Sequence, residues 1–277
     1  MKQKYIYMLY PEGKPKALTL SYDDGVRQDK RLVDILNRYG IKGTFNLCSG
    51  LLKGSGAANG PARIMSREDA VQLFKDSGHE VALHSLTHPW LDRLPSPMVY
   101  TEILEDRKNL ETMFDSVIQG MAYPQGTYSD TVVEAARQCG IVYARTTVST
   151  ENFKLPADWL LLHPTCHHNN PCLFELAERF TCEQPAFEPW LFYLWGHSYE
   201  FDNDNNWGRI EHFCEAISGK SDIWYATNIE IYNYVQAWNR LVFSTAVNKV
   251  YNPSATAVWF MFNYNMICVE PGQMVSI

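Results

Sequence analysis

The chain has 277 residues, of which 24 are Lys or Arg and 31 are Asp or Glu, and its formal net charge is −7. That charge disfavours a nucleic-acid-binding protein, because such proteins depend on a basic surface for their affinity. Hydrophobic residues make up 46% of the chain but no run of about 18 apolar residues occurs, so the sequence predicts a globular protein without a membrane span.

Predicted strands and helices alternate along most of the chain. Buried strands are expected at residues 16–22, 43–48, 80–84, 117–123, 141–145, 191–196 and 223–227. Helices are expected at residues 28–39, 66–78, 98–114, 130–139, 207–217 and 229–238. Residues 146–189 show no clear pattern. After about residue 246, two apolar runs at 256–264 and 266–270 follow one another without a helix and predict a β-hairpin.

Strands that alternate with helices predict βαβ units and a parallel sheet. About seven such units over about 240 residues fit a closed or nearly closed barrel better than an open sheet. The chain is accordingly divided into a barrel, residues 1–245, and a short β-rich appendage packed on it, residues 246–277.

The cysteines and the first residues bear on the cellular compartment. Seven cysteines without a CxxC pair predict reduced thiols in a cytoplasmic protein, with one local disulfide among Cys166, Cys172 and Cys182 as the alternative. The apolar run before Pro11 is too short and broken for a secretory signal, which also favours the cytoplasm, with a trimmed secreted chain as the alternative.

Chemistry in such a barrel is expected where the carboxyl ends of the strands meet. Asp23 and Asp24 follow the first strand, and His84 and His88 follow the third. Adjacent carboxylates repel one another unless a cation or a proton lies between them, and histidines four residues apart offer two imidazoles to one metal. One carboxylate with two histidines leaves coordination positions open for catalysis, and the second carboxylate is then free to act as a base. Each pair alone also fits a capped or hydrogen-bonded loop.

Two further strand ends carry polar and aromatic residues. The strand at 117–123 runs into the turn Tyr123, Pro124, Gln125, Gly126, Thr127 and Tyr128, and the strand at 191–196 is followed by His197. A tight turn of this kind can aim a backbone N–H at a substrate oxygen, and a histidine facing the same cavity can protonate a leaving group. A plain loop and a core histidine are the alternatives.

These residues resemble the motifs of the polysaccharide deacetylases, the NodB-homology domain of carbohydrate esterase family four. Residues 21–24, Ser-Tyr-Asp-Asp, are similar to the family's T-x-D-D, and residues 84–88, His-Ser-Leu-Thr-His, match its H-[ST]-x-x-H in full. Looser counterparts of the other motifs stand at residues 122–126 (R-x-P-Y-G), 158–159 (ending in D-W) and 194–197 (L-x-H, with one residue more). The resemblance covers roughly residues 15–240.

The resemblance implies a distorted (β/α)7 barrel and the metal-dependent removal of an N-acetyl or O-acetyl group from a carbohydrate or a related small molecule. The implied ligands of a divalent metal, usually zinc, are Asp24, His84 and His88, with Asp23 as the general base and His197 as the general acid. The implied substrate contacts are Tyr123, Pro124, Gln125 with its N–H at the oxyanion, Gly126, Tyr128, Trp159 as a wall of the acetyl pocket, Trp195 and His167. The expected partner is an acetylated sugar or oligosaccharide, with neither nucleic acid nor membrane, and the oligomeric state is not readable.

The chain departs from the family pattern at the third motif. The motif's arginine, which orients the base in the family, is Ala122 here, and its tyrosine is Gln125. A catalytically impaired carbohydrate-binding protein is therefore the alternative function. A non-haem iron oxygenase also uses two histidines and one carboxylate, but a β jelly roll and a different ligand order are expected for it.

The fourth motif is displaced, and three histidines that the usual pattern lacks lie near it: His163, His167 and His168. His163 and His168 are expected at the surface. His167 or its neighbour is a candidate to replace the missing arginine or to orient His197.

Overall fold

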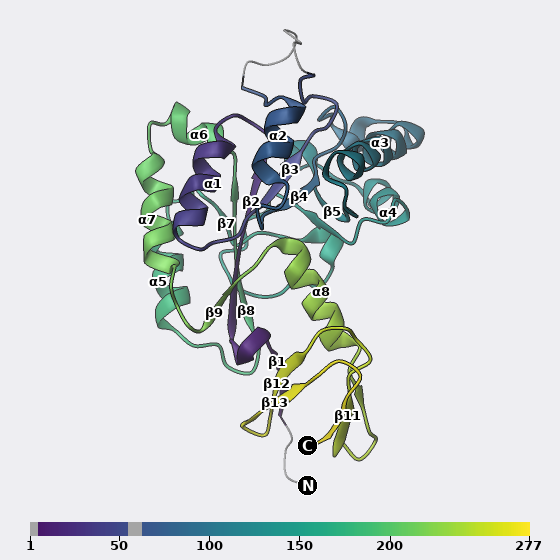
Figure 1. The fold of residues 1–277 in the computed structure, drawn as a ribbon, viewed down its shortest axis with the longest axis vertical. Coiled ribbons are helices and arrows are strands. Elements are labelled where there is room, and N and C mark those ends of the chain that lie inside the picture. The colour runs from purple at the N-terminus through teal and green to yellow at the C-terminus, as the bar shows by residue number, and fades with distance from the viewer. Residues whose placement is uncertain (1–4, 55–62) are drawn as a thin grey trace.

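The computed structural model describes residues 5–54 and 63–277, and within these residues seven parallel strands form a curled, distorted barrel (Figure 1). They are β2 (Lys16–Asp23), β3 (Thr44–Leu47), β4 (Glu80–Leu83), β5 (Gly120–Ala122), β6 (Tyr143–Arg145), β7 (Cys166–His167) and β8 (Trp190–Gly196). Their order around the sheet is β6-β5-β4-β3-β2-β8-β7. The expected (β/α)7 barrel is confirmed.

The two ends of this sheet meet beside β7. Leu162, just before β7, bridges in parallel to Arg145 at the end of β6, while β7 itself pairs with β8. One further strand, β9 (Ile223–Tyr225), pairs with the first residues of β2, whereas β3 pairs with its last three residues. Every residue of β2 is buried, as expected for a central strand covered on both faces.

Helices cover the outside of the barrel, with α1, α5 and α7 on one side and α3 and α4 on the other (Figure 1). Their bounds are α1 (Asp29–Arg38), α2 (Arg67–Phe74), α3 (Ser96–Phe114), α4 (Asp130–Gln138), α5 (Leu173–Cys182), α6 (Ser198–Asn203), α7 (Trp207–Ile217) and α8 (Asn228–Asn239). The side chain of Ser66 caps α2 as expected, by accepting the N–H of Asp69 at 3.0 Å. The helix ends at Phe74 instead of residue 78, because the backbone of Lys75 is extended.

The C-terminal part is β-rich. β12 (Val258–Phe262) and β13 (Asn265–Val269) form the expected antiparallel hairpin. β1 (Ile6–Leu9) pairs with β12 and completes a three-stranded sheet, which the sequence did not predict. A second small sheet is formed by β10 (Val242–Phe243), β11 (Lys249–Tyr251) and β14 (Met274–Ser276). The division of the chain at residue 246 stays a prediction.

Two other sequence expectations concern the membrane and the thiols. Among the described residues, no helix combines the length and the apolar character that crossing a bilayer requires. All seven cysteines, each of which lies in the described residues, are present as free thiols.

Candidate active site

A pocket of about 530 Å³ opens at the carboxyl ends of the barrel strands. The residues in its wall include Asp23, Asp24, Arg63, His84, His88, Tyr123, Gln125, Gly126, Thr147, Trp195, His197 and Tyr199. Its volume is within the range of about 300–1,000 Å³ that is usual for small-ligand sites. The pocket therefore gathers side chains from β2, β8 and the loops after β4 and β5 at one mouth.

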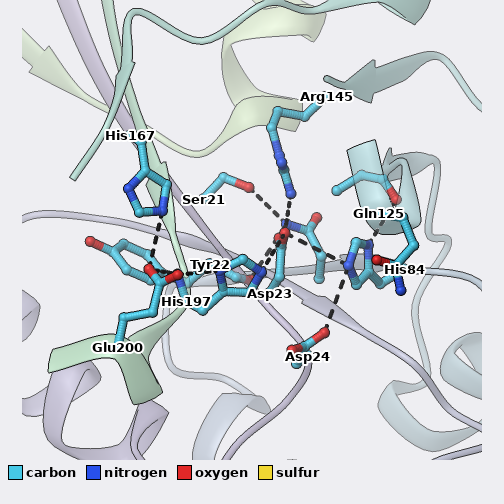
Figure 2. A network of polar contacts seen from close by, with 12 residues as sticks. Ser21, Tyr22, Asp23, Asp24, His84, Gln125, Arg145, His167, His197 and Glu200 are labelled. Atoms are coloured by element: carbon cyan, nitrogen blue, oxygen red, sulfur yellow. Dashed lines mark hydrogen bonds and ion pairs between the residues drawn. The ribbon is translucent and has the colours of Figure 1, made fainter. Parts of the chain in front are cut away.

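The carboxylate of Asp24 and the histidines His84 and His88 meet in this pocket, and Figure 2 shows Asp24 and His84. Oδ1 of Asp24 lies 3.5 Å from Nε2 of His88 and 3.8 Å from Nε2 of His84. These three ligand atoms lie close enough together to hold one metal ion. The separation between donors is longer than a hydrogen bond and leaves space for an ion between them.

The hydrogen bonding of His84 fits a metal at this point. Nδ1 of the buried His84 lies 2.9 Å from the carbonyl oxygen of Ala122 and donates its proton there. The lone pair of Nε2 then faces Asp24 and also Oδ2 of Asp23, at 3.7 Å. Burial lowers the pKa of His84, against the opposing effect of the two carboxylates, so the ring is neutral. A lone pair facing two carboxylates is unfavourable unless a cation lies between them, so these residues fit a divalent ion.

The backbone of the site is strained. Asp24, Ser85, His88 and Gln125 have positive φ angles of 80°, 63°, 59° and 59°. A left-handed backbone costs about 1–3 kcal/mol at a residue other than glycine, and it persists where the surroundings impose it. Nε2 of Gln125 lies 3.0 Å from Nδ1 of His88. For His88 to bind a metal through its own Nε2, the amide of Gln125 has to turn so that its oxygen accepts the ring proton on Nδ1. The strained backbone conformation therefore sets the directions in which these side chains point.

Asp23 is buried and is held by two neighbours. Nδ2 of Asn46 donates to Oδ1 of Asp23 at 2.8 Å, and Nη2 of Arg145 donates to Oδ2. Burial alone raises the pKa of Asp23, but the charge of Arg145, with smaller effects from His84 and His197, holds this pKa well below its ordinary value. Asp23 is therefore an ionised proton acceptor in the centre of the group (Figure 2).

Glu200, on α6, collects three imidazoles on the other side of Asp23. Its carboxylate oxygens lie 3.2 Å from Nδ1 of His197, 3.1 Å from Nε2 of His167 and 3.0 Å from Nε2 of His168. Burial raises the pKa of Glu200, but its contacts with the three histidines lower it well below the ordinary value overall. Burial alone lowers the pKa of His197, yet the hydrogen bond to Glu200 and the charge of Asp23 raise it overall. Nε2 of His197 faces Oδ2 of Asp23 at 3.8 Å.

His167, His197 and Glu200 also lie within reach of a single ion. The protonation of His167 argues against a metal there. The backbone N–H of Asn169 donates to Nδ1 of His167 at 3.1 Å, so the ring proton is on Nε2 and is donated to Glu200. We therefore interpret this group as a hydrogen-bonded cluster.

Four residues predicted to contact substrate lie off the pocket wall. Trp159, in the 3-10 helix η4 (Trp159–Leu161), packs edge-to-face on Tyr232 and lines a different cavity, away from this pocket. Pro124 is buried within the turn, and Tyr128 packs on Tyr123 with ring centres 5.3 Å apart. His167 lies behind Trp195 against Glu200.

Two expectations for the extra histidines are wrong. His168 is 1% exposed and not at the surface, because it packs between Tyr22 and Phe201. His167 does not replace the missing arginine, since Arg145 contacts Asp23 instead. His163 is half-buried and bonds through Nδ1 to Oγ1 of Thr146 at 2.6 Å.

Sequence reasoning missed Arg145 and Asn46, and it missed the contacts of Glu200 with the three histidines. Arg145 ends the apolar strand segment 141–145, and a charge at a barrel strand end was the signal that could have found it. Asn46 stands within the apolar segment 43–48 and is fully buried. Glu200 follows His197 by three residues, the spacing of a helix-start capping pair, and α6 does begin there.

Comparisons with known proteins match the first half of the chain. Residues 11–144 match the family model described as "Polysaccharide deacetylase". The chain is 28% identical over 147 residues to a peptidoglycan-N-acetylglucosamine deacetylase of Listeria monocytogenes, across 52% of this chain and 28% of that protein. It is 24% identical over 147 residues to a chitooligosaccharide deacetylase of a Bradyrhizobium species, across 52% of this chain and 59% of the relative. The matches thus span less than two thirds of either relative's length.

A solved structure extends the likeness of fold over more of the chain. A family 4 carbohydrate esterase from Streptomyces lividans, in complex with acetate, superposes with a TM-score of 0.52 at 15% identity, over 76% of this chain and 92% of that one. His197, Arg145 and Glu200 lie beyond the segment that the family model matches. Residues 11–144, which contain the two aspartates and the HSLTH pair, are thus similar to the polysaccharide deacetylase family.

Proposed function

We propose that the protein is a metal-dependent deacetylase that hydrolyses an N-acetyl or O-acetyl group on a carbohydrate. The observation that supports this most is the meeting, in one pocket, of three potential metal ligands, a buried ionised Asp23 and a proton-carrying His197. Asp24, His84 and His88 would hold the ion. We expect zinc, because two imidazoles and one carboxylate with open positions are typical of catalytic zinc sites.

A divalent ion held there supplies Lewis-acid chemistry, since it polarises an acyl oxygen and lowers the pKa of water. The proton of the attacking water goes to Asp23, whose Oδ2 lies between His84 at 3.7 Å and His197 at 3.8 Å. Arg145 keeps that carboxylate ionised and so able to accept the proton. The backbone N–H of Gln125, at the strained turn in the pocket wall, is the proposed donor to the oxyanion.

His197 gives a proton to the departing group. Its Nδ1 donates to Glu200, and the raised pKa of His197 favours the imidazolium, which carries a second proton on the Nε2 that faces Asp23. The bond from the acyl carbon to nitrogen or oxygen breaks as a new bond from that carbon to the water oxygen forms. Acetate leaves with the free amine or hydroxyl, and the proton on Asp23 replaces the one that His197 gave up.

The pocket wall suits a sugar. Tyr123, Trp195 and Tyr199 line it together with polar residues, and such aromatic faces pack against the apolar faces of sugar rings. The two relatives are named for N-acetylglucosamine in peptidoglycan and for chitooligosaccharides. We therefore expect the substrate to be an N-acetylated sugar or oligosaccharide. Ala122 motivated an impaired binding protein as the alternative, but Arg145 provides Asp23 with a cation from another strand.

An acetate-release assay tests the proposal. N-acetylglucosamine oligomers of increasing length and O-acetylated sugars are incubated with the zinc-loaded protein, and acetate is measured with and without a chelator. We expect release that the chelator abolishes and that added zinc restores. Saturable sugar binding with no acetate from any substrate at saturating zinc would establish the binding protein instead.

A further inference from the structure

We propose that Arg145 positions Asp23 for the reaction, and that Ala122 on the neighbouring strand is small in order to admit the arginine side chain. The inference rests on the proposed function for its catalytic part. Its structural part, that Arg145 is the cation that holds Asp23, stands on the contacts alone.

Arg145 is entirely buried, and its charge is directed at one carboxylate. Nη2 donates to Oδ2 of Asp23, and the guanidinium carbon lies 4.4 Å from the centre of the Trp195 ring. Within the described residues, Nε and Nη1 of Arg145 have no hydrogen-bond partner. A buried arginine is costly unless it is paired, so the contact with Asp23 accounts for its presence.

The strand register explains how the arginine reaches Asp23. Ala122, the last residue of β5, is the direct partner of Arg145 in β6. Side chains at paired positions of neighbouring strands lie on the same face of the sheet. The methyl group of the fully buried Ala122 leaves that face open for the long side chain of Arg145. The arginine thus stands one strand away from position 122, where the family motif has its own.

Arg145 acts through Asp23 and not on the substrate. It is absent from the pocket wall, whereas Asp23, Trp195 and His197 are part of it. Removing it should therefore change the placement of the base with little change in substrate binding. The expected signature is a loss of kcat with KM preserved.

The kinetic test uses three variants: Arg145→Met, Arg145→Lys and the exchange variant Ala122→Arg/Arg145→Ala. For Arg145→Met we expect kcat to fall about 100-fold, as when a reacting group is misplaced by about 1 Å, with bound zinc unchanged and KM within about twofold. The exchange variant should recover at least about tenfold of the lost kcat, because it returns a guanidinium to the paired position. Arg107→Met is the matched control, since Arg107 on α3 pairs with Glu111 away from the pocket, and its kcat should not change.

A second measurement does not need activity. The free energy of unfolding is measured for Arg145→Met, for Asp23→Asn and for the double variant. If Arg145 holds Asp23, Arg145→Met destabilises the wild type more than it destabilises the Asp23→Asn protein. If Arg145→Met does not fold, Arg145→Lys and the exchange variant take its place in both measurements.

The two measurements separate the possible failures. Additive unfolding free energies would overturn the contact between Arg145 and Asp23. A normal kcat in Arg145→Met, or a rise in KM with kcat preserved, would overturn the positioning role. A wild-type protein that releases no acetate would refute the proposed function and the catalytic part of this inference, while the unfolding measurements would still decide the contact.

Discussion

Glu200 should control the proton that His197 gives to the leaving group. Replacing it in Glu200→Gln keeps the shape and one acceptor oxygen but removes the negative charge that lies 3.2 Å from Nδ1 of His197. A hydrogen bond to a charged group contributes about 1.5–3 kcal/mol and a neutral one about 0.5–1.5 kcal/mol, so the imidazolium loses about 1–2 kcal/mol of stabilisation. The side chain of Glu200 is 24% exposed, and solvent screening favours the lower end of that range.

The lost stabilisation of the imidazolium lowers kcat because a smaller fraction of His197 is protonated. Since each 1.36 kcal/mol is a factor of ten, about 1–2 kcal/mol corresponds to about 5- to 30-fold in kcat where His197 titrates. The direction follows from the raised pKa of His197, which Glu200 helps to maintain against burial. Without that carboxylate, His197 loses its proton at a lower pH. In the variant, kcat should therefore start to fall at a lower pH than in the wild type.

The assay compares two leaving groups. Acetate release from an N-acetylated sugar requires protonation of the departing amine, whereas 4-nitrophenyl acetate loses a stable phenolate without that help. Glu200→Gln should be slow on the amide and nearly normal on the ester. Asp202→Asn is the control on the same helix, because Asp202 bonds to Trp207 and Gln28 and not to the histidines. Equal losses on both substrates, or none on either, would show that Glu200 does not act through His197.

The remaining predictions concern the base, a buried carboxyl group and the aromatic wall. Asp23→Asn should retain zinc in a metal analysis but lose turnover, whereas His84→Ala should lose both; full activity in Asp23→Asn would remove its role as base. Burial raises the pKa of Asp29 to about 8, so its carboxyl stays protonated in the folded protein while the unfolded chain ionises, and this stabilisation is lost as pH rises from about 4 to about 8. In urea unfolding, the wild type should therefore lose roughly 4 kcal/mol relative to Asp29→Asn between pH 5 and pH 8, at 1.36 kcal/mol for each pH unit, and parallel pH curves would contradict this. Trp195→Ala should raise KM for the sugar, whereas Trp159→Ala should leave KM unchanged; the opposite result would restore Trp159 to the substrate site.

The sequence predicted the barrel and the meeting of Asp24, His84 and His88 because both depend on short-range patterns. The alternation of strands and helices specifies a parallel sheet, and a parallel sheet brings all its strand ends to one mouth. The positions of Asp24, His84 and His88 after their strands were therefore enough to predict that these side chains meet. The place of Arg145 could not be predicted in the same way, because its meaning depends on which residue of β5 lies opposite it. That strand register is determined by tertiary structure, and in the sequence only the alanine at position 122 pointed to it.

The errors lie where local pattern was weak. The regular elements of residues 146–189 are the 3-10 helix η4, the two-residue strand β7 and the helix α5. Hydrophobic periodicity therefore gave little information about most of this segment. Trp159 was assigned to the pocket from the D-W pair alone, yet its ring packs on Tyr232 of α8, far along the chain. His168 was expected at the surface because of its polarity, but the rings of Tyr22 and Phe201 enclose it.

The pairing of β1 with β12 has a consequence for biosynthesis. Ile6 lies opposite Phe262, so the residues between them must be synthesised before β1 can pair with β12. Until then the backbone amides of β1 are unpaired, and an unpaired strand edge can pair with another nascent chain. Slow translation of the β12–β13 hairpin would prolong that exposure, and chaperone dependence in vivo should rise accordingly.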